Sequence, residues 1–173
     1  MMMLRLTMNR EDFMRKTALL LTMLAMAAAG TAVADDGDAV VGIWLTAPDT
    51  EDGQAKVEIY KEGDTYHGKI IWLEIPVFPP DDDRGMAGQE KVDRDNPEES
   101  LRSRPIVGLK IMSDFTFAGK GKWKKGTIYA PDDGKTYKCK LTLEGPDSLK
   151  VRGFVGISML GRTEMWTRAT DEE

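Results

Sequence analysis

The sequence predicts an all-β protein: a single antiparallel up-and-down β-barrel of about eight strands, preceded by a cleavable signal helix. Two observations predict this class. Between residues 41 and 168, apolar and polar residues alternate in short runs that Gly, Pro and Asp interrupt, and no sustained helical period appears. Residues 35–173 suffice for one core, and closing the sheet would remove exposed strand edges.

The individual strands follow from these runs. The expected strands cover 41–45, 55–60, 65–73, 107–111, 123–130, 135–143, 149–155 and 163–168, with a short strand or turn at 115–117. Gly-, Pro- and Asp-containing turns at 62–64, 131–134 and 144–147 join neighbours into hairpins. Residues 74–105 contain several prolines and an Asp-rich run, which predicts a long loop.

The first 34 residues have the features of a signal peptide. A basic head precedes an apolar run over 17–29, and Ala32-Val33-Ala34 supplies a small-x-small cleavage site. Met8 and Met14 are alternative starts to Met1. We therefore expect a signal peptide over 1–34 and a barrel domain over 35–173, in a periplasmic or secreted protein without a stable membrane anchor. An uncleaved anchor helix is the alternative, but the apolar run is shorter than the roughly 20 residues of a membrane span.

Charge and composition exclude several classes of protein. The whole chain has a net charge of −5; the leader holds four basic and two acidic residues, so residues 35–173 carry −7. A nucleic-acid binder would instead carry a basic excess. With one cysteine and one histidine, the chain cannot form an intramolecular disulfide or a zinc site of the His/Cys kind. Cys139 shares a strand face with apolar residues and is expected to be a buried small hydrophobe.

The sequence predicts no cofactor, no metal and no enzymatic activity. Residues 156–161 have one residue too many for a nucleophile elbow. His67 falls on the polar face of a hairpin, where we expect an exposed, incidental side chain. Aspartates at 81–83, 93 and 95 offer the oxygen ligands that calcium prefers, but their spacing does not fit an EF-hand, and charged loops are usually solvated.

The candidate ligand-binding residues are aromatic and aliphatic side chains expected to point into the barrel. These are Tyr66, Ile70, Trp72, Leu109, Tyr137 and Val151. In a small barrel such side chains fill the core, whereas in an eight-stranded barrel they can line a cavity for one small ligand. The sequence is compatible with both arrangements. The leading hypothesis is a carrier or sensor of a small apolar or amphipathic molecule. The alternative is an envelope protein-interaction module that uses the loop 74–105 and the hairpin around Trp123.

The first strand resembles that of lipocalin-like barrels. Gly42-Ile43-Trp44 is similar to their G-x-W motif. In that family an arginine at the end of the last strand packs over the tryptophan. The resemblance implies a structural role for Trp44 and Arg168, with Arg162 as the alternative partner.

More of the chain is similar to a secreted bacterial family known as domain of unknown function 2147, from about Gly42 to Arg168. The resemblance depends on residues 68–70, Asp93 with Asn96-Pro97, 108–109, 126–131 with Gly134 and Tyr137, 149–156, and 161–163 with Trp166 and Arg168. It implies export and a lipocalin- or calycin-like barrel, and it implies no established reaction. An insert around 79–92 departs from the family pattern and leaves the geometry of the mouth open.

Overall fold

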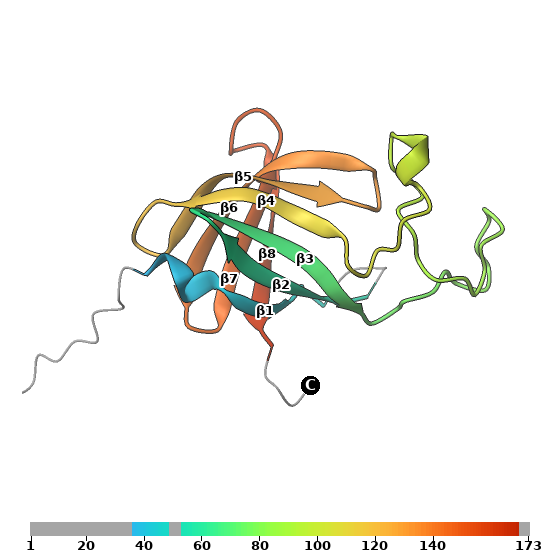
Figure 1. Cartoon of the computed structure of the whole chain (residues 1–173), viewed down its shortest axis with the longest axis horizontal. Helices are drawn as coiled ribbons and strands as arrows, with labels where there is room; N and C mark the ends of the chain where they lie inside the picture. The colour runs from blue at the N-terminus through green and yellow to red at the C-terminus, as the bar shows by residue number, and fades with distance from the viewer. Residues whose placement is uncertain (1–35, 49–52, 170–173) are drawn as a thin grey trace, which may run out of the picture. The chain divides into compact units, whose positions relative to one another are not determined.

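The computed structural model describes residues 36–48 and 53–169 and shows a closed antiparallel barrel of eight strands in chain order (Figure 1). The strands are β1 (Gly42–Leu45), β2 (Ala55–Glu62), β3 (Thr65–Leu73), β4 (Lys110–Phe117), β5 (Lys122–Ala130), β6 (Lys135–Gly145), β7 (Ser148–Phe154) and β8 (Gly161–Arg168). Each pairs with the next, and β8 pairs back with β1. The predicted fold class is confirmed. The expected signal segment, 1–34, lies outside the described residues.

Two short 3-10 helices accompany the strands: η1 (Gly37–Val40) before β1 and η2 (Glu99–Leu101) in the long β3–β4 connection. Across the described residues, no helix is both long and apolar enough to span a membrane. The predicted strand at 107–111 and the predicted short strand or turn at 115–117 are replaced by one bulged strand, β4, which begins at Lys110. At that bulge Asp114 has a φ of 62°, which lets the strand continue after an irregular register with β3.

One end of the barrel is closed by packing; we call it the closed end. Here η1 precedes β1, and Val40 and Trp44 are completely buried. The Trp44 indole Nε1 donates a hydrogen bond to the Val40 carbonyl at 2.8 Å, and Arg168 stacks over the same ring. Arg162, the alternative partner, instead pairs with Glu164. The opposite end, the open end, carries the β3–β4, β5–β6 and β7–β8 connections.

The core runs through the barrel from the closed end. Its buried members are Val40, Trp44, Val57, Ile59, Tyr66, Ile70, Ile106, Leu109, Ile111, Met112, Phe115, Trp123, Cys139, Leu141, Leu149, Val151 and Trp166. Phe115 lies so close to Gly126 that a Cβ there would meet its ring at 2.4 Å. The expectation of a buried Cys139 is confirmed, because its residue is 1% exposed.

Trp72 does not point into the barrel, contrary to the sequence prediction. The register of β2 with β3 pairs Val57 with Ile70 but Lys56 with Trp72, so Ile71 is an extra residue in a β-bulge. A bulge of one residue reverses the inside–outside alternation beyond it. Trp72 is therefore 42% exposed, with the Lys56 ammonium 5.3 Å from its ring centre.

His67 is buried, and the expectation of an exposed histidine is wrong. It occupies the outer face of β3 but is only 5% exposed, because groups on β2, β3 and β4 contact its ring. Its Nε2 lies 2.9 Å from the Thr65 hydroxyl, and its Nδ1 accepts from the Asp114 amide at 3.4 Å. The ring of Tyr60 packs against it at 5.8 Å between centres. His67 therefore packs among side chains and backbone on the outer face of β2, β3 and β4.

Candidate ligand-binding site

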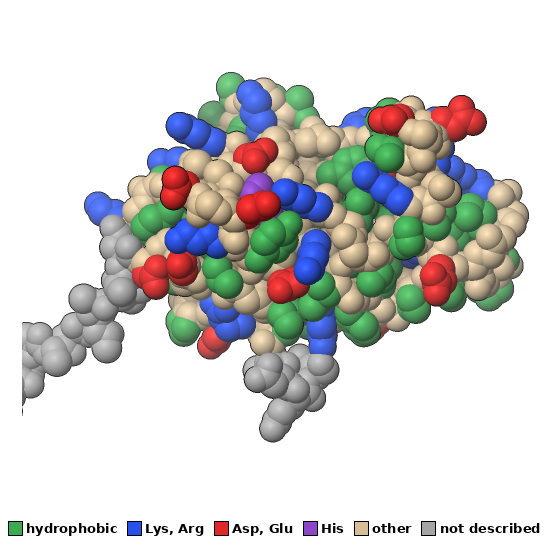
Figure 2. All heavy atoms as spheres, viewed as in Figure 1, with side chains coloured by type: hydrophobic (Ala, Val, Ile, Leu, Met, Phe, Trp, Pro, Cys, Tyr) green, Lys and Arg blue, Asp and Glu red, His purple; other side chains and the backbone are tan. Residues whose placement is uncertain are grey.

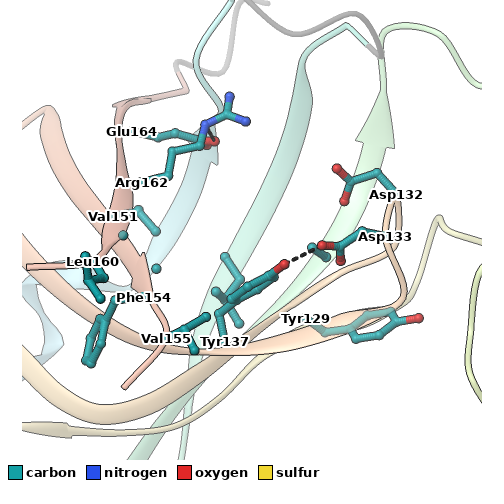
Figure 3. Close-up of a pocket in the computed structure, with 14 residues that line it drawn as sticks. Tyr129, Asp132, Asp133, Tyr137, Val151, Phe154, Val155, Leu160, Arg162 and Glu164 are labelled. Carbon is teal, nitrogen blue, oxygen red and sulfur yellow. Dashed lines mark hydrogen bonds and ion pairs between the residues drawn. The ribbon is translucent and has the colours of Figure 1, made fainter. Parts of the chain in front are cut away.

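A cavity of about 370 Å³ opens at the open end, between β5, β6, β7 and β8. It is lined by Ile128, Tyr129, Ala130, Asp132, Asp133, Tyr137, Val151, Gly153, Phe154, Val155, Leu160, Gly161, Arg162 and Glu164. Figure 3 shows apolar side chains of the β7–β8 region on one side of this cavity and Asp132 and Asp133 on the other. The lining is thus apolar with charged groups at particular positions, which is typical of sites for amphipathic molecules.

Tyr137 and Val151 are the two candidate residues that the structure brings together in this cavity. They stand on the adjacent strands β6 and β7. Val151 is buried and belongs to the core, so it marks the boundary between the filled and the hollow part of the barrel. Tyr137 is half-buried, and its hydroxyl donates a hydrogen bond to Asp133 in the β5–β6 turn (Figure 3). This bond fixes the tyrosine ring along the cavity wall.

The Tyr137–Asp133 contact changes the acidity of both groups. The hydrogen bond to Asp133, with burial and nearby negative charge, raises the pKa of Tyr137 above its ordinary value. Burial alone would raise the pKa of Asp133, but the bonds from the Tyr137 hydroxyl and the Lys135 amide outweigh it and lower that pKa. At neutral pH the pair is therefore a neutral phenol held by a carboxylate.

The other four candidates do not line this cavity. Tyr66, Ile70 and Leu109 belong to the packed core. The Tyr66 hydroxyl donates to Asp38 at 2.6 Å near η1, and its ring meets Trp123 edge-on at the closed end. Leu109 also borders a shallow surface hollow with Arg104 and Pro105. Trp72 lies on the outer surface. The barrel therefore combines a filled closed end with a hollow open end.

Glu164 and Arg162 are cavity residues that the sequence analysis did not select. Glu164 Oε1 lies 3.1 Å from Arg162 Nε, and its Oε2 accepts from the Trp166 indole at 3.1 Å. A signal for Glu164 was present in the sequence. Residues 164, 166 and 168 are two apart and therefore share one face of β8, so an inward Arg168 implies an inward Glu164.

The long connection 74–109 supports the cavity wall at Tyr129 and the β5–β6 turn. Asp93 is completely buried, and each of its oxygens is satisfied. Its Oδ1 accepts from the Tyr129 hydroxyl at 2.6 Å, and its Oδ2 accepts from Asn96 and Arg104, both at 2.8 Å. Burial, together with the bond to Asp93, raises the pKa of Tyr129. This network fastens the loop to β5.

A close backbone contact completes this attachment. Gly134 has a φ of 66°, and a Cβ at this position would lie 1.9 Å from the Asp95 carbonyl oxygen. Only glycine permits the approach, because any side chain would meet the loop backbone. The residues that carried the family resemblance, Asp93, Asn96, Tyr129 and Gly134, thus converge at one place although they lie far apart in the sequence.

Three aspartates of the long loop, Asp82, Asp93 and Asp95, pair with arginines in this structure. Asp82 pairs with Arg94 at 2.5 Å, and Asp95 pairs with Arg84 at 2.7 Å. Among the described residues, no group of three or more His, Cys, Asp or Glu side chains is arranged to hold a metal ion. The geometry shows a loop stabilised by ion pairs.

Neither the thiol nor the imidazole is among the residues that line the cavity, although Cys139 pairs across strands with the lining residue Gly153. Burial raises the pKa of Cys139 to about 12, so its thiol is protonated at neutral pH. His67 lies on the outer face of β3 and is not among the lining residues. The cavity offers carboxylates, a guanidinium and a phenol, a set suited to orienting a polar group.

Comparison with known proteins agrees with this geometry. A family model described as an uncharacterised protein conserved in bacteria, domain of unknown function 2147, matches residues 42–168. Among solved structures, protein HP1028 from the human pathogen Helicobacter pylori, described as belonging to the lipocalin family, superposes with a TM-score of 0.64 at 26% identity, covering 76% of this chain and 84% of that one. A search of curated proteins found no significant match.

Proposed function

Because the chain belongs to the bacterial family of domain of unknown function 2147 and forms a lipocalin-like barrel, we propose that it binds a small apolar or amphipathic molecule at the open end. The observation that carries this proposal is the cavity of about 370 Å³ between β5 and β8. Its size falls in the range of small-molecule sites, roughly 300–1,000 Å³. Apolar walls would receive the hydrocarbon part, and the charged rim would orient a polar group.

We infer binding rather than catalysis. A catalytic site needs a nucleophile or base beside a place for the reacting atom. The thiol of Cys139 is buried and protonated, and His67 lies outside the cavity. Among the lining carboxylates, Asp133 has a lowered pKa, which makes it a weaker base than a free aspartate. The leader sequence further supports a place in the periplasm or outside the cell. Mass determination of the mature N-terminus tests that location, with cleavage after Ala34 as the expected result.

The alternative, a protein-interaction module, has less support. This hypothesis requires the hairpin around Trp123 as a docking surface. However, Trp123 is completely buried, and its indole Nε1 donates a hydrogen bond to the Gly37 carbonyl at 3.2 Å. Trp123 therefore cannot serve as an exposed aromatic anchor for a partner. Cross-linking in intact cells with and without residues 79–92 tests this alternative; loss of a specific partner would favour it.

Gly153 provides a direct test of cavity binding. A Cβ at Gly153 would make ordinary contacts, 3.6 Å from Ile128 and 3.9 Å from Tyr137, so larger side chains can extend into the cavity. We expect Gly153→Ala, Gly153→Val and Gly153→Leu to weaken binding of the fluorescent probe N-phenyl-1-naphthylamine progressively, by about tenfold or more for the largest. Thr136→Val, at an exposed position of β6, is the control. Equal probe affinity in all folded variants would contradict the proposal.

The natural occupant can be sought in the same protein. Material isolated from its own compartment is extracted under denaturing conditions, and the extract is examined by mass spectrometry. We expect an apolar or amphipathic compound that is absent from the Gly153→Leu variant. An identical extract from both proteins would mean that the compound does not occupy the cavity.

A further inference from the structure

The loop between β7 and β8, residues 155–160, concentrates exposed apolar side chains; we call it the apolar loop. Val155, Ile157, Met159 and Leu160 are 66%, 62%, 84% and 68% exposed. Every other exposed large hydrophobic residue in the described ranges is at most 47% exposed. Figure 1 shows this loop projecting beyond the barrel wall, and Figure 2 shows apolar side chains gathered at the same place. Such concentration on one surface marks an interaction site.

Two hydrogen bonds within the apolar loop and two from Arg152 satisfy part of the loop backbone, including the carbonyls of residues 157–160. The Val155 amide donates to the Leu160 carbonyl at 3.1 Å, and the Leu160 amide donates to the Ile157 carbonyl at 3.0 Å. Arg152 reaches from β7 to the loop, and its guanidinium donates to the Ser158 and Met159 carbonyls at 2.8 and 3.3 Å. These bonds lower the cost of moving the loop backbone out of water, which is the main obstacle to placing irregular structure in lipid.

Basic side chains surround the base of the apolar loop. Arg162, the second residue of β8, is 71% exposed at its side chain, and its Nε pairs with Glu164 Oε1 at 3.1 Å. Lys138 and Lys140 stand on β6 opposite Phe154 and Arg152 of β7. The Lys140 ammonium also lies 5.1 Å from the Phe154 ring centre. Glu164 offsets the charge of Arg162, so Lys138 and Lys140 supply the positive charge at this place on an otherwise acidic domain, and that charge complements phosphate headgroups.

We propose that the apolar loop inserts into the interfacial region of a phospholipid bilayer, with Lys138 and Arg162 at headgroup level. The loop is a narrow tip of six residues. A stable protein interface would need about 800 Å² on each partner, which calls for a broader surface. An apolar tip whose carbonyls are largely hydrogen-bonded, with basic side chains at its base, has the chemistry of an interfacial anchor. Because the proposal depends on the loop, it stands independently of whether the cavity holds a ligand.

This placement would also bring the cavity to the membrane. Val155, Leu160 and Arg162 belong both to the apolar loop or its base and to the cavity lining (Figure 3). A bilayer that covers the loop would therefore lie beside the cavity mouth. Loading from lipid is a consequence to be tested separately, and the binding experiment below requires no cavity ligand.

A tryptophan at the loop tip tests insertion directly. Met159→Trp protein is mixed with phosphatidylethanolamine–phosphatidylglycerol vesicles, and all variants are compared in the same processed form so that the N-terminal sequence contributes equally. When vesicles are added, we expect the emission of the introduced tryptophan to shift to shorter wavelength, a shift that the wild-type protein should not show. Lipids brominated near the headgroup end of the acyl chain should quench this emission. Absence of both, with a native circular dichroism spectrum, would overturn the proposal.

Vesicle flotation measures the contribution of the apolar side chains. Ile157→Ser with Met159→Ser should reduce partitioning by about tenfold or more, because two exposed apolar side chains no longer enter the bilayer. The control is Ile75→Ser with Val107→Ser, two exposed apolar residues of the β3–β4 connection. Equal flotation of the loop variant and wild type would refute the proposal. Binding that high salt abolishes completely would also refute it, because that binding would be purely electrostatic. A concentration-dependent dimer that the loop variant loses would refute it as well, because the loop would then be a protein interface.

Discussion

The guanidinium carbon of Arg168 lies 4.2 Å from the centre of the Trp44 ring and so joins the last strand to the first. The same guanidinium donates to the carbonyls of Ala39 at 2.8 Å, Val41 at 3.1 Å and Pro146 at 2.8 Å. One side chain thereby satisfies backbone carbonyls within and directly after η1 and in the β6–β7 turn. The closed end depends on this arginine for both packing and hydrogen bonding.

Replacing Arg168 should destabilise the barrel. We expect Arg168→Ala to lower the free energy of unfolding by about 2–3 kcal/mol, since three carbonyls lose a charged donor and the cation–π contact disappears. Arg168→Lys keeps the charge but not the planar set of donors, so only part of the loss should be recovered. Urea unfolding measures both. Arg162→Ala, at an exposed position, is the control; similar losses at 162 and 168 would contradict the proposed role.

Asp93 should govern the attachment of the long loop. Asp93→Ala leaves Arg104, Asn96 and the Tyr129 hydroxyl without their shared acceptor, and breaking a buried charged pair costs about 3–5 kcal/mol. We expect faster proteolysis within 74–105 together with a lower unfolding temperature. Asp81→Asn, at an exposed position of the same loop, is the control and should change neither. Unchanged loop cleavage in the Asp93 variant would contradict this attachment.

The Tyr137–Asp133 pair predicts a pH dependence of stability. The pKa of Asp133 is lowered below 3.8 in the folded protein. Its contribution to the free energy of unfolding is therefore fully present above pH 3.8 and is lost as the pH falls through the lower folded-state pKa. The pKa of Tyr137 is raised above 10.0 in the folded protein. Its contribution to the free energy of unfolding is therefore fully present below pH 10.0 and is lost as the pH rises through the higher folded-state pKa.

The variant that isolates this pair is Tyr137→Phe. The stability difference between wild type and Tyr137→Phe should be constant between these limits and should shrink beyond each of them. Chemical unfolding measured across the pH range checks the expectation. A difference that stays the same in strong acid and strong alkali would show that the hydrogen bond makes no pH-dependent contribution.

Cys139 should be unreactive in the native protein. Burial raises the pKa of its thiol to about 12 and excludes reagents, so alkylation by iodoacetamide at mildly alkaline pH should proceed only as fast as the protein unfolds. An exposed cysteine introduced as Thr136→Cys in a Cys139→Ala background should react rapidly under the same conditions. Rapid labelling of Cys139 in folded protein would contradict its burial.

Trp72 and His67 show where sequence alternation failed. Alternation assumes one residue per position along a strand, but the bulge at Ile71 adds one and turns Trp72 outward. At His67 the alternation correctly predicts the outer face, yet Thr65, Asp114 and Tyr60 cover that face. Bulges and outer-face packing depend on neighbouring strands, so they are not visible in a single run of residues.

By itself, the sequence determined the fold class: period-two runs and turn chemistry specify eight antiparallel strands, and the G-x-W motif identifies the first of them. It also identified Tyr137 and Val151 as inward-facing. Only the tertiary structure decided which part of the barrel is hollow, that Glu164 and Arg162 face each other there, and that Asp93 holds the long loop to Tyr129. The physical reason is that patterning is local, whereas a cavity and a buried ion pair depend on the register and packing of strands far apart in the chain.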